Sequence, residues 1–345
     1  MLVKRARRVL GVPLEGGATS YHRVVQPLYE LLQEGHPVQF LGKQEIQAEQ
    51  YDWAEILYIQ CLYAPGAYQF YTEQKAKGKI LILDFDDDYI NIPEDCPEQT
   101  EVIDATTGEV VKFAPALRAL YIKLFCELAD VVVVSTNILK NLYAPYARNI
   151  KMVPNCVSPE MARDIPKTKN TATRVIWSGS PSHWQDLYML IDPLTELHQK
   201  YGNRVEIHLQ GKLNFKEIFK EIPFIEHPSV DFSEYLNKVQ EINPDIALGP
   251  LQANVFNAGR SNLKYSQMTL MGAAFIGSQF GPYLCIDHEY DGMLAGSSKD
   301  WVKCLSKLVD NEKLRTTLAN NAMNSVKANH MIATHLHKWR ELLVV

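Results

Sequence analysis

Hydrophobic and polar positions along this chain follow two different periods in turn. Short apolar runs such as KILILDF at 79–85 are nearly continuous, which is typical of strands buried on both faces of a parallel sheet. Between these runs, apolar residues recur three or four positions apart, as they do on one face of a helix. The pattern predicts strands at 8–14, 38–41, 56–61, 79–85, 131–135 and 150–153, and helices at 21–34, 66–77 and 117–129.

A second series of the same kind begins after a polar, proline-containing segment at 158–173, which we interpret as a linker. The predicted strands are 174–178, 205–209, 246–250 and 273–276, and the predicted helices are 184–201, 232–242, 300–309, 312–328 and 332–343. Strands that alternate with helices are typical of an α/β fold with parallel sheets. We therefore expect two Rossmann-like domains, 1–165 and 172–329. The segment 94–111 is interpreted as a long irregular insertion.

Composition and charge narrow the class of protein. A chain of 345 residues is long enough for two domains of ordinary size. Its formal net charge of −5 argues against a protein that mainly coats nucleic acid. No apolar run approaches the ~20 residues of a membrane span, so we expect no integral membrane segment and a cytoplasmic location. The six cysteines are scattered without metal-ligand spacing, and no metal or cofactor is expected.

Two predicted turns between a strand and a helix carry small or polar residues that suit an anion. The first turn, 15–18, contains Gly16 and Gly17. The second contains Gly179, Ser180 and His183. Free N–H groups at a helix start favour negative charge. For each turn, a purely structural role stays an alternative, and for His183 the two roles have equal weight.

The stretch 254–283, NVFNAGRSNLKYSQMTLMGAAFIGSQFGPY, is the most informative part of the chain. It places Arg260, Ser261, Asn262 and Lys264 at the apparent start of a helix that precedes an apolar strand and a Gly-Pro turn. Two cations beside free N–H groups form a site for a diphosphate. An ordinary amphipathic helix with a solvated basic face is the alternative.

This stretch resembles the donor loop of GT-B glycosyltransferases of the family 4 type, Lys/Arg-Ser-x-x-Lys-x-x-Glu followed by a strand of small residues. Gln267 stands where that family usually carries Glu. VPNCV at 153–157 is similar to the family's later (I/V)-P-N-G-V-D, with Cys156 in place of Gly. The pattern W-x-G-S-x-x-H-x-x-D-L at 177–187 resembles family 4-like enzymes of capsule loci and phage genomes.

The resemblance implies a GT-B fold, in which the last helix (330–345 here) returns to the first domain. It also implies transfer from a nucleotide sugar, UDP- or GDP-linked, with retention and without a metal. Arg260 and Lys264 would then be the catalytic residues that stabilise the leaving diphosphate. The donor-binding residues would be Gly16, Gly17, Gly179, Ser180, His183, Gln210, Ser261, Asn262 and Gln267. Gln267 cannot match a carboxylate's charge, so a non-catalytic sugar-nucleotide-binding subunit stays an alternative.

The acidic run DFDDD at 84–88 follows a predicted buried strand, where open α/β sheets place their ligands. It fits three interpretations: the DxD metal site of GT-A enzymes, the nucleophile motif of haloacid-dehalogenase-like phosphatases, or an acceptor-facing loop of a GT-B enzyme. The phosphatase would use Asp84 and Asp86. We favour the acceptor loop, with Asp86 and Asp87 as its catalytic pair.

Two acceptors follow from the resemblance: a surface or capsular glycan, or the hydroxymethyl group of a modified pyrimidine in phage DNA. In the second case the location would be the cytoplasm of a bacterial host. A DNA acceptor requires one basic face, formed by Lys4, Arg5, Arg7, Arg8, Lys75, Lys77 and Lys79. The acidic net charge favours the glycan slightly.

Overall fold

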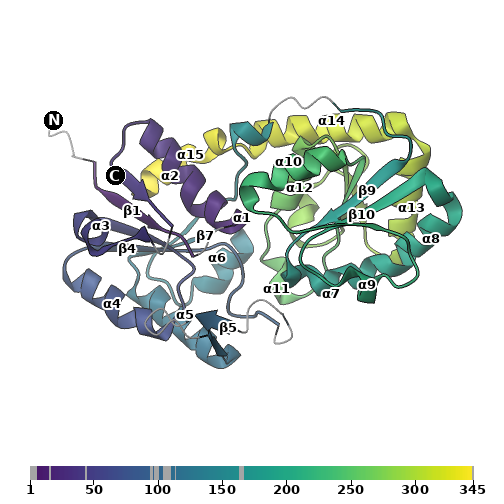
Figure 1. Ribbon diagram of the computed structural model, residues 1–345. Coiled ribbons are helices and arrows are strands. Elements are labelled where there is room, and N and C mark those ends of the chain that lie inside the picture. Colours follow the sequence, from purple (N-terminus) through teal and green to yellow (C-terminus); the bar gives the residue numbers. More distant parts are fainter. Residues whose placement is uncertain are drawn as a thin grey trace.

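Two six-stranded parallel sheets, each covered by helices, lie side by side in the protein (Figure 1). The computed structural model describes residues 6–14, 17–42, 45–93, 96, 101–103, 110–112, 114–162 and 167–343. We call the two halves the N-lobe, which contains strands up to residue 152, and the C-lobe, which contains strands from residue 173 onward.

The N-lobe sheet has the strand order β2-β1-β3-β4-β7-β8, and every pair in it is parallel. The strands are β1 (Val9–Val12), β2 (Val38–Phe40), β3 (Ile56–Gln60), β4 (Ile80–Phe85), β7 (Val131–Val134) and β8 (Ile150–Met152). The helices are α1 (Ala18–Ser20), α2 (Gln26–Gln33), α3 (Ala48–Trp53), α4 (Pro65–Ala76), α5 (Pro115–Leu128) and α6 (Asn137–Tyr143). A π-helical turn, Tyr21–Val25, joins α1 to α2.

The C-lobe sheet has the order β11-β10-β9-β12-β13-β14 and is also parallel throughout. The strands are β9 (Thr173–Ser178), β10 (Val205–Gln210), β11 (Ile225–His227), β12 (Ile246–Gly249), β13 (Ala274–Ser278) and β14 (Met293–Ala295). The helices are α7 (Trp184–Leu187), α8 (Ile191–Tyr201), α9 (Phe215–Ile218), α10 (Phe232–Ile242), α11 (Val255–Ala258), α12 (Leu263–Leu270), α13 (Ser298–Asp310) and α14 (Glu312–Asn329). The strand order reverses between β9 and β12, and ligands of such sheets bind at that point, outside the carboxyl ends of the strands.

The last helix, α15 (Ile332–Leu343), returns from the C-lobe and lies beside α2 of the N-lobe (Figure 1). Its buried side chains, among them Trp339, pack in one core cluster with β1 and α2. Where the chain crosses back, Val157 forms an isolated parallel bridge with Met331. The predicted two-domain GT-B architecture is therefore confirmed, whereas the domain boundaries 1–165 and 172–329 stay predictions.

The sequence pattern missed several short elements. The segment 94–111, interpreted as irregular, contains β5 (Glu101–Ile103), which pairs antiparallel with β6 (Val110–Lys112), so that interpretation is wrong for the described part. The helix α3 and the three-residue strands β11 and β14 were not predicted. Three residues cannot display a period of their own, and the six residues of α3 include none that are buried, so no apolar face marks this helix. The predicted helix 184–201 is interrupted by a 3₁₀ turn, Tyr188–Leu190.

Candidate active site

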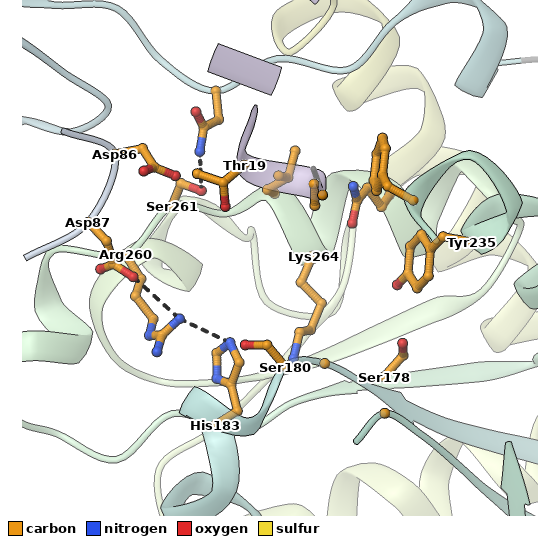
Figure 2. Close-up of a pocket in the computed structure, with 18 of the residues that line it drawn as sticks. Thr19, Asp86, Asp87, Ser178, Ser180, His183, Tyr235, Arg260, Ser261 and Lys264 are labelled. Atoms are coloured by element: carbon orange, nitrogen blue, oxygen red, sulfur yellow. Dashed lines mark hydrogen bonds and ion pairs between the residues drawn. The ribbon is translucent and has the colours of Figure 1, made fainter. Parts of the chain in front are cut away.

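A cavity of about 520 Å³ lies between the two lobes. The C-lobe lines it with the carboxyl ends of β9 and β10, with α12 and with the start of α10. The N-lobe lines it with the turn before α1 and the turn after β4. Both sheets thus present their carboxyl ends to the same space, which is where α/β sheets bind ligands. Figure 2 shows ten of the lining residues by name.

Arg260, just before α12, is held in place from several sides. Its Nε donates to Asn257 Oδ1 at 3.0 Å, Nη1 lies 3.1 Å from His183 Nε2, and Nη2 lies 3.1 Å from Ser182 Oγ. The guanidinium stands 4.7 Å from the centroid of the Phe256 ring. A cation held this firmly loses little side-chain entropy when an anion binds, so the site is preorganised.

His183 links Arg260 to a buried carboxylate. Its Nδ1 lies 2.8 Å from Asp186 Oδ2. The carboxylate can only accept, so Nδ1 carries the proton and Nε2 accepts from Arg260. Burial, with the charges of Arg260 and Lys264, lowers the pKa of His183 well below its usual value, so the imidazole is neutral. His183 therefore lines the cavity and also orients Arg260.

Lys264, in the first turn of α12, has an ammonium group that is buried against Trp177, 4.9 Å from the ring centroid. Among the described residues its Nζ finds no hydrogen-bond partner. Burial, with a contribution from Arg260, lowers the pKa of Lys264 to about 7, although Asp186 opposes the shift. Figure 2 shows the side chain reaching toward Ser180. A buried donor without a partner is costly, and an anionic ligand would remove that cost.

Asp86 and Asp87 face these cations from the N-lobe (Figure 2). Asp87 Oδ2 lies 3.6 Å from Arg260 Nη1. Asp86 accepts from the Tyr89 hydroxyl at 3.0 Å, and burial together with the charges of Asp87 and Asp84 raises the pKa of Asp86 to about 7. One carboxyl group close to half-protonation at neutral pH and a second beside a cation can serve proton transfer.

Asp84 has a different place from its neighbours in sequence. Its side chain is fully buried and is not among the described residues that line the cavity. Arg23 Nε and Nη2 donate to its two oxygens at 2.8 and 2.5 Å, and the Tyr58 hydroxyl donates at 2.6 Å. A carboxylate that is fully buried, paired with Arg23 and not among the described lining residues does not reach a substrate in the cavity. The phosphatase interpretation, which needs Asp84 as its nucleophile, is therefore disfavoured.

Most of the other residues predicted to bind the donor line the cavity. These are Gly17, Gly179, Ser180, Gln210, Ser261 and Gln267. A Cβ at Gly179 would lie 3.1 Å from Lys264 Nζ and 2.8 Å from the Trp177 ring, so the glycine is needed for this close approach. Gly16 lies outside the described residues. Asn262 is not a lining residue, because its amide turns away and donates to Cys285 Sγ at 3.3 Å.

The structure adds lining residues that the sequence did not single out, including Thr19, Tyr235 and Phe232. Tyr235 and Ser178 lie at the end of the cavity away from Asp86 and Asp87 (Figure 2). The Ser178 hydroxyl donates to Gln210 Oε1 at 3.1 Å. Nothing in the sequence marks Tyr235, because it sits in a helix whose apolar face explains it equally well.

Within the described residues, no group of three His, Cys, Asp or Glu side chains is placed to hold a metal ion. In the same part of the chain, no helix combines the length and the apolar character needed to cross a membrane.

Comparison with known proteins finds similarity at the level of structure. No protein-family model and no curated protein matches the sequence. The Anabaena HepE in complex with UDP and glucose superposes with a TM-score of 0.66 at 13% identity, covering 98% of this chain and 99% of that one. An alpha-glucosyltransferase in complex with UDP and a 13-mer DNA containing an HMU base gives 0.65 at 12% identity, with coverage of 98% and 99%.

TarM superposes with a TM-score of 0.61 at 16% identity. The match covers 84% of this chain but only 54% of TarM, so this chain spans about half the length of TarM. At such identities the likeness speaks for the fold alone. Together with the two parallel sheets and the returning helix, it shows that this chain has the two-domain GT-B fold found in glycosyltransferases.

Proposed function

We propose that this protein is a glycosyltransferase that moves a sugar from a nucleotide-sugar donor to a hydroxyl acceptor. The observation that carries the proposal is the buried ammonium of Lys264, which has no partner among the described residues and stands beside the firmly held Arg260. Both lie at the amino end of α12, whose free N–H groups favour an anion. A diphosphate would supply the hydrogen-bond partner that Lys264 lacks among the described residues.

The same arrangement suits the reaction. Transfer breaks the bond between the sugar's anomeric carbon and the diphosphate oxygen, and forms a bond from that carbon to the acceptor oxygen. Arg260, Lys264 and the helix end stabilise the charge that develops on the departing diphosphate. Asp86 and Asp87 face the cations from the opposite lobe, where they orient the acceptor hydroxyl and receive its proton. We propose retention of configuration, as in the family 4 type that the sequence resembles.

UDP is the first candidate for the nucleotide, with GDP as the alternative. The solved structures of HepE and of the alpha-glucosyltransferase both contain UDP. Both match this chain over almost its entire length at TM-scores of 0.66 and 0.65. The end of the cavity with Tyr235, Ser178 and Gln210 offers a ring and hydrogen-bonding groups that suit a nucleoside.

The positions of basic residues favour a glycan over DNA as acceptor. A DNA acceptor required Lys75, Lys77 and Lys79 on the face of the active site. Lys79 immediately precedes β4, whereas Asp86 follows its carboxyl end, so the two are roughly 20 Å apart at the rise of an extended strand. Lys79 Nζ is engaged by the carbonyl of Ala54 at 2.7 Å, and Lys75 Nζ lies 3.1 Å from Asp130.

The N-terminal basic residues are placed similarly. Arg7 and Arg8 precede β1, at the amino end of the same sheet, and Arg8 pairs with Glu55 at 3.3 Å. Lys4 and Arg5 lie outside the described residues. Arg7, Arg8 and Lys79 therefore lie at the amino end of the N-lobe sheet, opposite the carboxyl end that lines the cavity. We accordingly propose a surface or capsular glycan as the acceptor, with hydroxymethylated DNA as the alternative.

Donor binding is tested by thermal unfolding with UDP, GDP and their glucose conjugates. A ligand that binds the folded state raises the melting temperature by mass action. We expect at least one of these to raise it and Lys264→Ala to abolish the shift, while Lys299→Ala, at an exposed position of α13, leaves the shift intact. No shift at millimolar ligand with the wild-type protein would contradict the proposal.

Activity and acceptor are tested with nucleotide sugars labelled in the sugar. Label transferred to a capsular or surface glycan supports the proposed acceptor. Label that stays in hydroxymethylated duplex DNA after phenol extraction, and is absent from unmodified duplex, would overturn it in favour of DNA. Binding of a donor without any hydrolysis or transfer would instead support a non-catalytic sugar-nucleotide-binding subunit.

A further inference from the structure

We call the stretch 254–283 the donor loop. Two of its side chains, which line the cavity, are hydrogen-bonded to residues on the other side of the lobe boundary. Ser261 is bonded to Asn155, and Gln267 is bonded to His22. Asn155 lies in the segment that leaves the N-lobe after β8. His22 contacts the same segment through a hydrogen bond to the carbonyl oxygen of Cys156. These contacts determine which hydrogen-bonding atoms of the donor loop remain for a ligand.

The direction of the first bond follows from Arg23. Its Nη1 donates to Asn155 Oδ1 at 3.0 Å and to the carbonyl of Val153 at 2.7 Å. A guanidinium has no acceptor, so Asn155 must turn its oxygen to Arg23 and its NH₂ to Ser261. The Asn155 amide then donates to Ser261 Oγ at 2.9 Å. Because that oxygen is accepting, the Ser261 hydroxyl proton is free to donate to another group.

The direction of the second bond follows from a backbone carbonyl. His22 Nδ1 lies 2.8 Å from the carbonyl oxygen of Cys156, which can only accept. Nδ1 therefore carries the proton, and burial keeps the ring neutral by lowering the pKa of His22 to about 4. Nε2 is then an acceptor, and Gln267 Nε2 donates to it at 3.1 Å. Gln267 must keep its carbonyl oxygen for another group.

We propose that Asn155 and His22 are positioning residues that set the hydrogen-bond polarity of the donor site. Through them Ser261 presents a proton to a phosphate oxygen of the donor, and Gln267 presents an oxygen to a hydroxyl of its ribose or sugar. This inference rests on the proposed function, since it concerns how the nucleotide sugar is held. It identifies Gln267 as the residue that this site needs: a glutamate there has no proton to donate to neutral His22.

Gln267→Glu separates this proposal from the view that Gln267 is a weakened glutamate. We expect the variant to bind UDP or GDP about tenfold more weakly than the wild type does. The reason is that a carboxylate at this position and His22 Nε2 are both acceptors, so the hydrogen bond between them is lost. Calorimetric titration of both nucleotides measures the difference. Nitrogen-15 NMR of His22 without ligand should show the neutral ring with Nδ1 protonated in the wild type. Tighter binding by Gln267→Glu, or a wild-type ring protonated at Nε2, would overturn the role of His22.

A double-mutant cycle tests Asn155. If Asn155 acts through Ser261, then Asn155→Ala and Ser261→Ala each weaken nucleotide binding by about tenfold, and the double variant is no weaker than Ser261→Ala alone. Asn170→Ala is the matched control, because this asparagine also lies between β8 and β9 but bonds Asp245 and Asn243, away from the cavity. It should bind nucleotide as the wild type does. Additive losses in the double variant would show that Asn155 acts independently of Ser261, and the proposal for Asn155 would fall.

The same titrations keep the two hypotheses apart. Failure of the wild-type protein to bind either nucleotide overturns the proposed function and this inference with it. Binding by the wild type that is unchanged in Asn155→Ala, Ser261→Ala and Gln267→Glu overturns this inference and leaves the proposed function standing.

Discussion

Asp84 of the N-lobe and Lys264 of the C-lobe are both buried charges next to the carboxyl ends of parallel strands, yet their surroundings are opposite. Asp84 receives three hydrogen bonds, from Arg23 and Tyr58, and Arg23 also stands 5.1 Å from the Trp339 ring centroid. Lys264 has no hydrogen-bond partner among the described residues. A charge that is fully paired within the protein serves the fold, whereas one left without a partner marks where a ligand binds.

The difference also explains why neighbours in the acidic run have unlike roles. Asp84 is the last but one residue of β4 and points to the protein interior, where it pairs with Arg23. Asp86 and Asp87, beyond the strand end, line the cavity. Within two residues the chain passes from a side chain that organises the N-lobe to side chains that face the C-lobe cations.

The largest expected effect is on stability and comes from the paired charge. Asp84→Asn removes the negative partner of buried Arg23, and breaking a buried pair costs about 3–5 kcal/mol. The free energy of unfolding from urea titration should fall by that order. As a control, Asp310→Asn breaks the exposed ion pairs with Lys200 and Arg204, while the new amide oxygen can still accept from the Tyr201 hydroxyl. This variant should change the free energy of unfolding by under about 1 kcal/mol. Equal losses of stability in both variants would show that the buried Asp84 pair contributes no more to the fold than an exposed pair does.

The unpaired charge should behave in the opposite way. Lys264→Met removes an ammonium whose pKa burial has lowered from 10.5 to about 7, so the folded state disfavours its charge. At pH 7 the unfolded chain binds this proton more tightly than the folded chain does, so removing the group should stabilise the ligand-free protein. One unit of pKa shift corresponds to about 1.4 kcal/mol, which sets an upper bound of about 4 kcal/mol on this gain. Urea titration without nucleotide gives this value. Destabilisation as large as that of Asp84→Asn would show that Lys264 also serves the fold.

Donor affinity should depend on pH through the same group. Lys264 binds a diphosphate in its charged form, so affinity for a nucleotide sugar is full below pH 7 and declines above it, by at most about tenfold per pH unit. Asp186 and Arg260 are the other charges that act on Lys264. Asp86, which also lines the cavity, has a pKa of about 7 and titrates in the same range.

Calorimetry at pH 6 to 9 measures this dependence directly, without the effect of proton transfer on turnover. The Lys264→Met variant should bind the nucleotide sugar weakly, and its affinity should not show the decline above pH 7 that the wild type shows. An affinity of the wild type that is constant from pH 6 to 9 would show that Lys264 does not contact the donor.

The smallest expected effect is that of chelation. Protein cations rather than a metal ion stabilise the diphosphate in the proposed mechanism, so turnover measured with labelled nucleotide sugar should be unchanged by EDTA. Loss of turnover on chelation and its recovery with manganese would assign a metal to the carboxylates of Asp86 and Asp87, and the proposed roles of Arg260 and Lys264 would have to be revised.

The sequence predicted the fold well because the information is local. Runs such as 79–85 and 131–135 are apolar enough to identify β4 and β7, and the donor-loop pattern located Arg260 and Lys264 at the start of α12. The roles of Asp84 and Gln267 could not be predicted in this way. Asp84 depends on Arg23, 61 residues away, and Gln267 on His22, 245 residues away, and no local pattern records such pairings.

Asn262 is a residue that the local motif places correctly in the chain but whose side chain does not line the cavity. It lies between Ser261 and α12, as the donor-loop pattern requires, yet its amide points to Cys285. Adjacent residues at a helix start project in different directions, so a motif can name a segment without telling which of its side chains reach the ligand.

The bridge between Val157 and Met331 has a mechanical consequence. The chain passes between the lobes twice, and here the two passages are tied together: the Val157 N–H donates to the carbonyl of His330 and the Ile332 N–H donates to the carbonyl of Val157, both at 2.9 Å. These two backbone bonds prevent one passage from sliding along the other unless the bonds break. Any rearrangement of the two lobes that keeps these bonds must therefore be a rotation about Val157 and not a shear.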